Sequence, residues 1–288
     1  MTVPRISVVI PHYDDPASLD RCLSALGQQT IAEPFEIVVA DNMSPQGEAA
    51  IAAAIGGRAR LALAHDRGAG PARNAGVAES TGEVLAFTDS DCVPQPGWLA
   101  AGVAALERHD LVGGRMTVEV GANERSGAEA FEQVFAFDNR SYVEDKGFTV
   151  TANLFVRRAT FDAVGGFRTQ VSEDAEWCWR ARAAGYRLGY AHDAVVGHPA
   201  RPDWAALLHK WRRINAESFA LACEARGGRM RWLAKSWLLP VSIVAHVPRV
   251  LRSPALSQTA HRRAALATLA RLRMWRFVDS HRLLFTRR

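Results

Sequence analysis

Short apolar runs alternate with segments of helical spacing along the first ninety residues of the chain. Each run is rich in apolar or β-branched residues and ends in a polar segment, which is typical of a buried strand. These runs lie at 6–11, 35–40, 59–64 and 85–91. The segments between them have the composition and spacing of helices, at 16–28, 48–55 and 71–80. This alternation predicts an α/β fold with a mostly parallel, doubly wound sheet flanked by helices.

The rest of the chain continues this pattern less regularly and then becomes helical. Further strand-like runs lie at 111–116, 151–158 and 186–190, and further helical segments at 98–109 and 174–184. Beyond residue 200 the helical segments are 204–223, 232–247 and 264–285. We therefore expect an α/β domain over 1–200, followed by a basic helical extension over 201–288.

Charge is divided unevenly between these two parts. Residues 1–198 carry 17 lysines and arginines against 26 acidic residues, a net charge of −9. Residues 199–288 carry 18 basic residues against 4 acidic ones, a net charge of +14. A basic extension on an acidic body indicates an anionic partner, either a nucleic acid or a membrane surface. No nucleic-acid recognition motif accompanies the charge, which favours the membrane surface.

The four cysteines lie far apart and form no C-x-x-C pair. This usage indicates a reducing compartment, without structural zinc or a disulfide framework. No signal-peptide pattern precedes the first strand, so we expect a cytoplasmic protein, peripheral at the inner face of the cell membrane.

Two carboxylates, Asp89 and Asp91, stand at the end of the fourth strand-like run. Residues two apart on a strand face the same side, and open α/β sheets bind ligands at the carboxyl ends of their strands. Carboxylate oxygens at this spacing suit Mg²⁺ or Mn²⁺, which commonly bind substrate phosphates as well. Asp-Ser-Asp before Pro94 and Pro96 is also good turn chemistry, so a polar turn is the alternative.

Four motifs follow one another in a characteristic order. They are V-V-I-P-H-Y at 8–13, E-I-V-V-A-D-N-M-S at 36–44, G-P-A-R-N-A-G at 70–76 and D-S-D at 89–91. In this order they resemble the family 2 glycosyltransferases, and the resemblance runs from about residue 6 to about residue 200. It implies a Rossmann-like nucleotide-diphospho-sugar transferase fold of GT-A type. A nucleotide-binding half of about 1–115 and an acceptor half of about 116–200 follow from it.

The resemblance places the base and ribose of a nucleotide-sugar donor at the ends of the first two strands. Pro11, Tyr13 and Asp41 are the residues concerned, and the Asp41 carboxylate can accept a hydrogen bond from a uracil or thymine imide N–H. Asn42 stands where the family often has a second aspartate. The alternative for Asp41 is a helix cap or a turn residue.

Arg73, Asp89, Asp91 and His198 complete the expected donor site. Arg73 lies near the start of a helix and suits a diphosphate or the base edge, because helix N-termini and guanidinium groups both favour anions. The resemblance makes Asp91, Asp89 and His198 the ligands of a divalent cation, Mn²⁺ or Mg²⁺, with Asp89 also contacting the nucleotide. The alternatives are a surface arginine on an amphipathic helix and a structural histidine.

Glu173 and Asp174 follow a G-G-F motif at 165–167, in an arrangement that also resembles the family. An acceptor hydroxyl must lose its proton as it attacks the anomeric carbon, and a positioned carboxylate can take that proton. Asp174 is therefore the expected general base, and Glu173 would orient the site or contact the acceptor. Both are also ordinary residues for the first turn of a helix, which is the structural alternative.

The basic extension gives a less specific signal. Residues 209–213 do not match the Q-x-x-R-W motif of processive family members, so a polysaccharide synthase is not indicated. The segment 232–247 falls short of a membrane span, and could be a buried helix or one that dips into an interface. The segment 264–285 is amphipathic and flanked by arginines, which fits an interfacial helix on anionic lipid. Packing against the catalytic body is the alternative.

These observations predict an inverting, metal-dependent glycosyltransferase. It would move a sugar from a UDP- or dTDP-type donor to a hydroxyl of a lipid-linked or glycan acceptor, in envelope polysaccharide assembly. A degenerate, membrane-associated scaffold of the same fold is one alternative. A nucleotidyltransferase is the other, although residues 11–15 are acidic and offer no glycine-rich, basic loop for a triphosphate.

Overall fold

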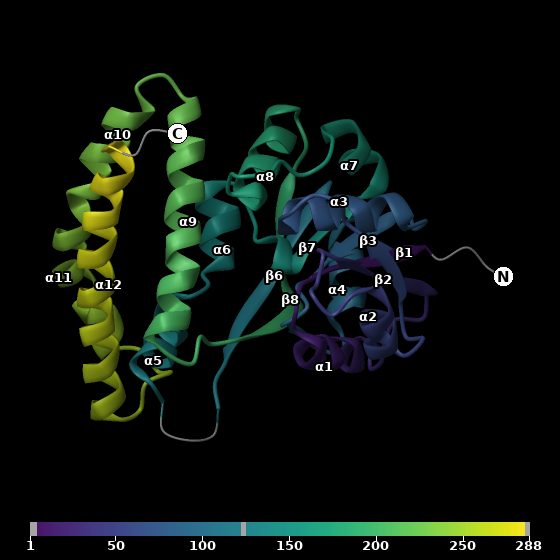
Figure 1. Cartoon of the computed structure of the whole chain (residues 1–288), viewed down its shortest axis with the longest axis horizontal. Coiled ribbons are helices and arrows are strands. Elements are labelled where there is room, and N and C mark those ends of the chain that lie inside the picture. Colours follow the sequence, from purple (N-terminus) through teal and green to yellow (C-terminus); the bar gives the residue numbers. More distant parts are fainter. Residues whose placement is uncertain (1–4, 122–124, 286–288) are drawn as a thin grey trace. The chain divides into compact units, whose positions relative to one another are not determined.

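The computed structural model describes residues 5–121 and 125–285, which form two compact units (Figure 1). The first, which we call the sheet unit, comprises the chain up to Thr117 with Asp138–Thr169 and Glu173–His198. The second, which we call the helical unit, comprises Val118–Phe137, Gln170–Ser172 and the chain from Pro199 onward.

A mixed α/β sheet forms the sheet unit. Its strands are β1 (Ile6–His12), β2 (Phe35–Asp41), β3 (Arg60–Leu63), β4 (Val84–Phe87), β5 (Val93–Pro94), β6 (Leu111–Glu119), β7 (Leu154–Arg157) and β8 (Leu188–Pro199). The last residues of β6 and β8 already belong to the helical unit. The strand order is β3-β2-β1-β4-β7-β6-β8-β5.

Helices flank this sheet, as the sequence predicts. Those of the sheet unit are α1 (Pro16–Leu26), α2 (Glu48–Ile55), α3 (Ala69–Glu79), α4 (Trp98–Ala105), α6 (Asn139–Ser141), α7 (Arg158–Val164) and α8 (Glu173–Ala183), with a π-helical turn at Tyr142–Lys146 and a 3₁₀ turn at Thr151–Asn153. Strands β1 to β4 pair in parallel. Helices α1 to α3 connect them along the chain, as the crossover connections of parallel strands require. Strand β7 runs antiparallel to β4 and β6, and β5 runs antiparallel to β8. The predicted α/β fold class is confirmed, with a sheet that is mixed and not mostly parallel.

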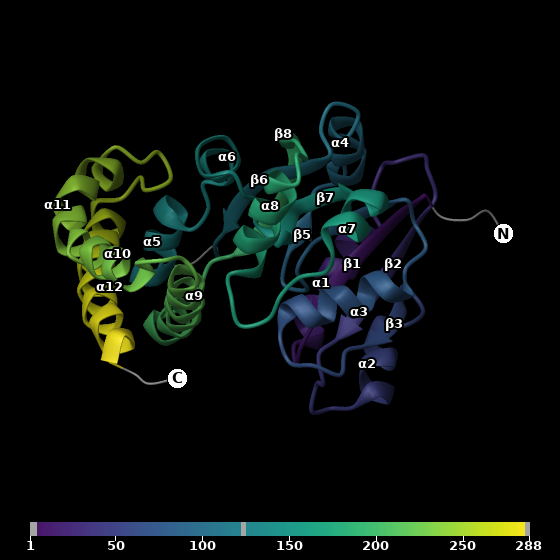
Figure 2. The same cartoon turned by 90° about the horizontal axis from the view of Figure 1, so that it is seen from above.

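Local sequence explains how the first elements form. Asp15 accepts a hydrogen bond from the Ser18 backbone N–H at 3.0 Å, and Pro16 occupies the first helical position of α1. Helix α3 lies alongside β1 to β3 (Figure 2). Its close approach depends on Gly76, because a Cβ there would lie 2.6 Å from Val9 Cγ1.

The strand that precedes the D-S-D motif ends earlier than the sequence suggests. Strand β4 stops at Phe87, and the Cys92 backbone N–H donates to the Asp89 carbonyl at 3.0 Å. Asp89 and Asp91 therefore stand on a turn beyond the sheet and do not alternate along a strand. Turn formation, given above as the alternative to a metal site, is part of how this site is built.

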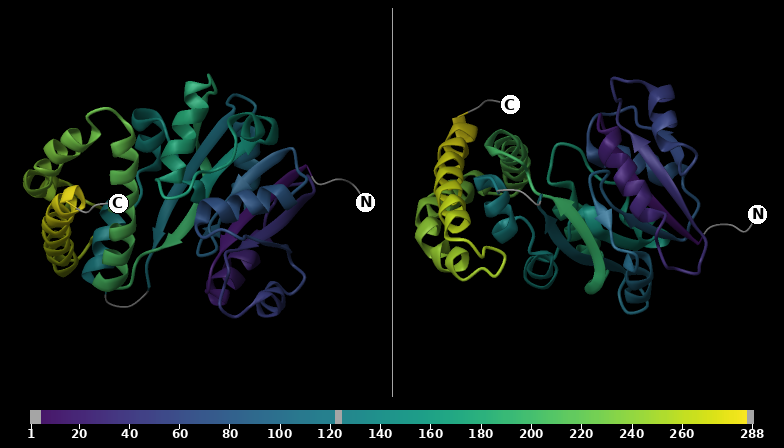
Figure 3. Two further views of the ribbon diagram at one scale, coloured as in Figure 1. Left: turned by 45° about the horizontal axis from the view of Figure 1, so that its top comes forward. Right: turned by 90° about the horizontal axis from the view of Figure 1, so that it is seen from below.

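The helical unit is a bundle. Its helices are α5 (Gly127–Phe135), α9 (Trp204–Glu224), α10 (Gly228–Ser236), α11 (Leu238–Leu251) and α12 (Thr259–Phe285). Helix α12 packs against the other four (Figure 3). The apolar segment 232–247 is divided between α10 and α11. In the part of the chain that the structure describes, no helix has the length and hydropathy of a membrane span.

Candidate active site

Three polar side chains meet where β1 and β2 end. The strand register pairs His12 with Asp41, and His12 Nδ1 lies 3.0 Å from Asp41 Oδ1. Ser44 donates its backbone N–H to Asp41 Oδ2 at 3.0 Å and its hydroxyl to Oδ1. Burial raises the pKa of Asp41, but the hydrogen bonds from Ser44 and His12 outweigh burial and hold the pKa below its ordinary value. Asp41 is thus a buried, ionised carboxylate that holds a turn, and base recognition by Asp41 stays a prediction.

Asn42, the residue that departs from the family pattern, fixes the loop before α3. Its Nδ2 donates to the Asp66 carbonyl at 2.7 Å, and its Oδ1 accepts from the Gly68 N–H at 2.8 Å. A carboxylate could accept from Gly68 but could not donate to Asp66. The asparagine therefore ties the end of β2 to the start of α3.

Two large side chains are exposed just beyond these strand ends. Tyr13 follows β1, and Met43 follows β2 with a positive φ of 60°. Pro11, the residue before the β1 terminus, is paired with Ala40 in the sheet and is only partly exposed. The aromatic ring of Tyr13 and the thioether of Met43 are therefore exposed at the strand ends. Tyr13 was predicted as a site residue and Met43 was not.

Arg73, on α3, lies buried between two carboxylates. Its Nη2 donates to Asp89 Oδ1 at 2.6 Å, its Nη1 donates to Glu173 Oε1 at 3.1 Å, and its guanidinium lies 6.0 Å from the Phe167 ring centroid. Burial lowers the pKa of Arg73, but Asp89 and Glu173 more than reverse this, so the pKa is raised above its ordinary value. Arg73 is therefore a buried cation that links the D-S-D turn to the start of α8, and not a surface arginine.

Asn74 clamps the G-G-F loop. Its Oδ1 accepts from the Phe167 N–H at 2.8 Å, and its Nδ2 donates to the Phe167 carbonyl at 2.9 Å. Gly166 permits this approach, because a Cβ there would lie 2.8 Å from Asn74 Oδ1. Phe167 in turn belongs to the aromatic core of the sheet unit, with its ring centroid 5.4 Å from that of Phe87. The sequence analysis missed this clamp, although Asn74 lies within the G-P-A-R-N-A-G motif.

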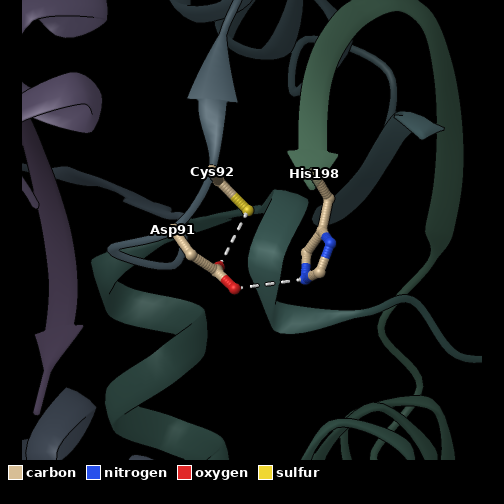
Figure 4. A group of neighbouring side chains, drawn as sticks. All are labelled: Asp91, Cys92 and His198. Carbon is tan, nitrogen blue, oxygen red and sulfur yellow. Dashed lines mark hydrogen bonds and ion pairs between the residues drawn. The ribbon is translucent and has the colours of Figure 1, made fainter. Parts of the chain in front are cut away.

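Asp91 and His198 come together from distant parts of the chain (Figure 4). His198 is buried near the end of β8, and its Nε2 lies 3.5 Å from Asp91 Oδ2. The Cys92 thiol lies 3.8 Å from Asp91 Oδ1. Among residues 5–121 and 125–285, these three form the one group of histidine, cysteine and acidic ligand atoms within 4.8 Å of one another. Burial, with Asp89 and Asp91 nearby, raises the pKa of the Cys92 thiol well above its ordinary value.

Asp174 and Glu173 occupy the first turn of α8. Asp174 is half-buried, and its Oδ1 accepts from the Ala175 N–H at 2.8 Å. Its charge also raises the pKa of Arg73, after the larger effects of Asp89 and Glu173. Acidic side chains stabilise this end of a helix, so the two residues also fit the structural alternative of ordinary first-turn residues. The general-base role of Asp174 stays a prediction.

The structure therefore brings the expected residues together in three clusters. Asp41 is held with His12 and Ser44, Asp91 lies beside His198, and Asp89 lies with Arg73 and Glu173. Asp89 faces the guanidinium and is not part of the Asp91, Cys92 and His198 group.

The mixed sheet flanked by helices is the GT-A type fold of glycosyltransferases. A mannosyltransferase, PcManGT from Pyrobaculum calidifontis, solved in complex with GDP-Man and Mn²⁺, matches with a TM-score of 0.60 at 21% identity, over 96% of this chain and 88% of that one. S. aureus TarS (1–349) matches with a TM-score of 0.51 at 17% identity, over 96% of this chain and 71% of that one. At these identities the likeness concerns the fold.

Sequence comparison gives the family. The model of glycosyl transferase family 2 matches residues 7–173. Glycosyltransferase AglE of Haloferax volcanii is 35% identical over 223 residues, 74% of this chain and 73% of that protein. The pre-mycofactocin glycosyltransferase of Mycobacterium tuberculosis is 34% identical over 154 residues, 49% of this chain and 33% of that protein. The chain belongs to glycosyl transferase family 2, which confirms the predicted family and enzyme class.

Proposed function

We propose that the protein is an inverting, metal-dependent glycosyltransferase that moves a sugar from a UDP- or dTDP-type donor to a hydroxyl of a lipid-linked or glycan acceptor. The observation that carries the proposal is the approach of His198 to Asp91 at the D-S-D turn. Inversion, and hence a single displacement, is the stereochemistry expected from the family resemblance.

The donor nucleotide is assigned to the ends of β1 and β2. Tyr13 and Met43 offer exposed surfaces against which a base can pack, and Pro11 and Asp41 border them. Asp41 is ionised and can accept an imide N–H through a remaining lone pair. That PcManGT was solved with GDP-Man and Mn²⁺ supports a nucleotide-sugar donor and a divalent cation for this chain too.

The residues at the D-S-D turn fit a divalent cation. Asp91 supplies a carboxylate oxygen and His198 an imidazole nitrogen, a pairing that suits Mn²⁺ at least as well as Mg²⁺. One Asp89 oxygen is taken by Arg73, so we assign Asp89 to the nucleotide and the cation through its other oxygen. A cation held here would supply charge neutralisation to the diphosphate and so stabilise the leaving nucleotide.

The acceptor reaction is assigned to the start of α8. The acceptor hydroxyl oxygen forms a bond to the anomeric carbon while the bond from that carbon to the diphosphate oxygen breaks. Asp174 takes the hydroxyl proton, and Glu173, held by Arg73, orients the site. The basic helical unit would keep the enzyme on the anionic inner face of the cell membrane, where a lipid-linked acceptor lies.

A binding screen tests the donor and metal assignments. Thermal shift and calorimetry would compare UDP, dTDP, GDP and CDP and the corresponding triphosphates, each with Mn²⁺ or EDTA, on the wild type and Asp91→Asn. Asp162→Asn, which removes an exposed carboxylate on α7, is the matched control. We expect one nucleotide to stabilise the wild type and Asp162→Asn only with Mn²⁺, by about 2.7 kcal/mol at a hundredfold excess over Kd. Asp91→Asn should lose this stabilisation.

Two outcomes would overturn the proposal. If no nucleotide bound with Mn²⁺ present, the chain would be a scaffold of this fold. If nucleoside triphosphates bound more tightly than every diphosphate, the nucleotidyltransferase alternative would gain. Stabilisation by GDP alone would keep the enzyme class and correct the donor type.

A further inference from the structure

Helix α11 exposes several large apolar side chains, while two of its polar side chains, Ser242 and His246, are half-buried. Leu238, Val241 and Val244 are 63%, 66% and 75% exposed. Ser242 and His246 each make a hydrogen bond of 2.6 Å to a backbone carbonyl of the same helix. A helix on the surface of a water-soluble protein usually turns charged and polar side chains to the solvent. The outward face of α11 is therefore suited to an apolar environment.

The exposed side chains form one stripe along the helix. We call them the α11 stripe: Trp237, Leu238, Val241, Val244, Pro248 and Leu251. Trp237 directly precedes the helix, and from Leu238 onward the spacing of three or four residues puts the side chains on one side of it. At 1.5 Å per residue the stripe is about 20 Å long, which is too short to span a bilayer but suits a helix lying in its interface.

The part of the chain that carries this stripe is rich in positive charge and has no acidic residues. From residue 225 to residue 278 the chain contains eleven lysines and arginines and no aspartate or glutamate. Lys235 precedes the stripe, and Arg249 and Arg252 accompany its end, all exposed. Exposed apolar residues bordered by exposed cations complement an anionic lipid surface, which offers acyl chains beneath phosphates.

The sequence pattern favoured the segment 264–285 as the interfacial helix, but the structure gives that helix another place. Helix α12 packs against α5, α9, α10 and α11. Leu269 and Leu272 are buried in the core of the helical unit, and Asp279 is buried with a hydrogen bond from Asn215 at 2.8 Å. Helix α12 thus organises the bundle. It exposes Met274, Val278 and Phe285, while α11 and the adjoining Trp237 expose the longer apolar stripe.

We propose that the α11 stripe inserts into the interface of an anionic lipid bilayer, with Lys235, Arg249 and Arg252 contacting headgroup phosphates. A second copy of the chain suits this surface poorly, because two such acid-free, basic faces would repel each other. The assignment rests on the proposed function in one respect, because both place a lipid-linked acceptor at the membrane surface that the stripe would enter.

Vesicle flotation of the full chain tests the assignment. The probes are vesicles of phosphatidylglycerol mixed with phosphatidylcholine, and vesicles of phosphatidylcholine alone. Val244→Glu places a charge on the stripe, Val278→Glu places the same charge on α12 at a residue 62% exposed, and Leu63→Glu places it on β3 at a residue 40% exposed. We expect Val244→Glu to weaken partitioning to anionic vesicles by about tenfold or more, because it puts a charge where the proposal places a valine among lipid acyl chains. The other two variants should bind within about twofold of the wild type, and 0.5 M salt should weaken binding of all forms, as is typical of surface electrostatics.

Three outcomes would overturn the assignment. The first is no difference between Val244→Glu and Leu63→Glu, and the second is loss of binding in Val278→Glu alone, which would return the interface to α12. The third is a wild-type dimer in light scattering that Val244→Glu converts to a monomer, which would make the stripe a protein interface. Nucleotide binding measured without vesicles reports on the proposed function separately, so either proposal can fail alone.

Discussion

Arg73 of the sheet unit and Arg276 of the helical unit are cations that are held in different ways. In the sheet unit, Arg73 is buried between Asp89 and Glu173. In the helical unit, Arg276 lies over the Trp211 ring, with its guanidinium 4.2 Å from the ring centroid. Burial, with a smaller contribution from Arg273 nearby, lowers the pKa of Arg276 to about 9.

Arg276 is not an isolated case. Arg271 lies over Trp204 at 3.9 Å, whereas Lys210 shows the other arrangement, pairing with Glu132 at 2.6 Å. A cation between two carboxylates fixes both of them in position, which is what a catalytic site requires. A cation on a ring is held in place while its charge stays uncompensated, so it still contributes to the field that attracts an anionic partner.

The largest effect that this comparison predicts is catalytic. Asp174→Asn should lower kcat about 10²- to 10⁴-fold, because the acceptor proton loses its carboxylate base. Nucleotide binding should persist, since the donor contacts lie elsewhere in the sheet unit. Initial transfer rates and calorimetry with the nucleotide found by the screen measure the two quantities. Full activity in Asp174→Asn would remove the general-base assignment, and Asp162→Asn controls for the loss of a carboxylate.

The next effect concerns stability. Arg73→Met should lower the free energy of unfolding by about 3–5 kcal/mol, because Asp89 and Glu173 would lose their shared cation in a largely buried site. Urea denaturation of the full chain measures the change. A loss below about 1 kcal/mol would mean that water replaces the guanidinium, and the contrast between paired and ring-stacked cations would weaken.

A smaller effect depends on pH. Asp41→Asn should cost about 1–3 kcal/mol at pH 7, because the hydrogen bonds from Ser44 and His12 lose their ionised acceptor. The pKa of Asp41 is lowered in the folded state, so its contribution is present above the unfolded pKa of about 3.9 and is lost as pH falls through the folded value. Thermal unfolding from pH 7 to pH 2 should show the wild type and the variant converging at the acid end. A constant difference across that range would contradict this.

The smallest effect should come from the helical unit. Arg276→Met should change the free energy of unfolding by no more than about 1 kcal/mol, because removing a cation without a carboxylate partner relieves desolvation while losing the ring contact. Arg263→Met, at an exposed position on the same helix, is the matched control. If urea denaturation showed that Arg276→Met lowers the free energy of unfolding by more than about 2 kcal/mol, the ring contact of Arg276 would be comparable in strength to the carboxylate pairing of Arg73.

Clear periodicity made the first half of the fold predictable. The helix expected at 48–55 and the strand expected at 35–40 match α2 and β2 to within one residue. The end of β4 was misplaced, because the turn formed by Asp89 and Cys92 competes locally with strand extension. The split of 232–247 into two helices was not visible, because Ser236 and Trp237 are not helix breakers.

The candidate site was predictable only where short motifs carry it. The D-S-D motif pointed to Asp91, and the family resemblance pointed to His198, which the structure brings within 3.5 Å. The partners of Arg73 could not be read from the sequence, because Glu173 lies a hundred positions away and only the fold brings it near. The outward face of α11 was equally hidden, since an apolar stripe looks the same in sequence whether it meets a protein core or a lipid.

The side-chain amide of Asn74 pairs with the backbone of Phe167 in the way that a neighbouring strand would. One amide both accepts from the N–H and donates to the C=O of the same residue, so it recognises a backbone conformation and no side-chain identity. Aspartate would satisfy half of this pairing and leucine none of it. The G-G-F loop before α8 is thus held at two points by one side chain, and its backbone conformation is fixed whatever side chain stands at position 167.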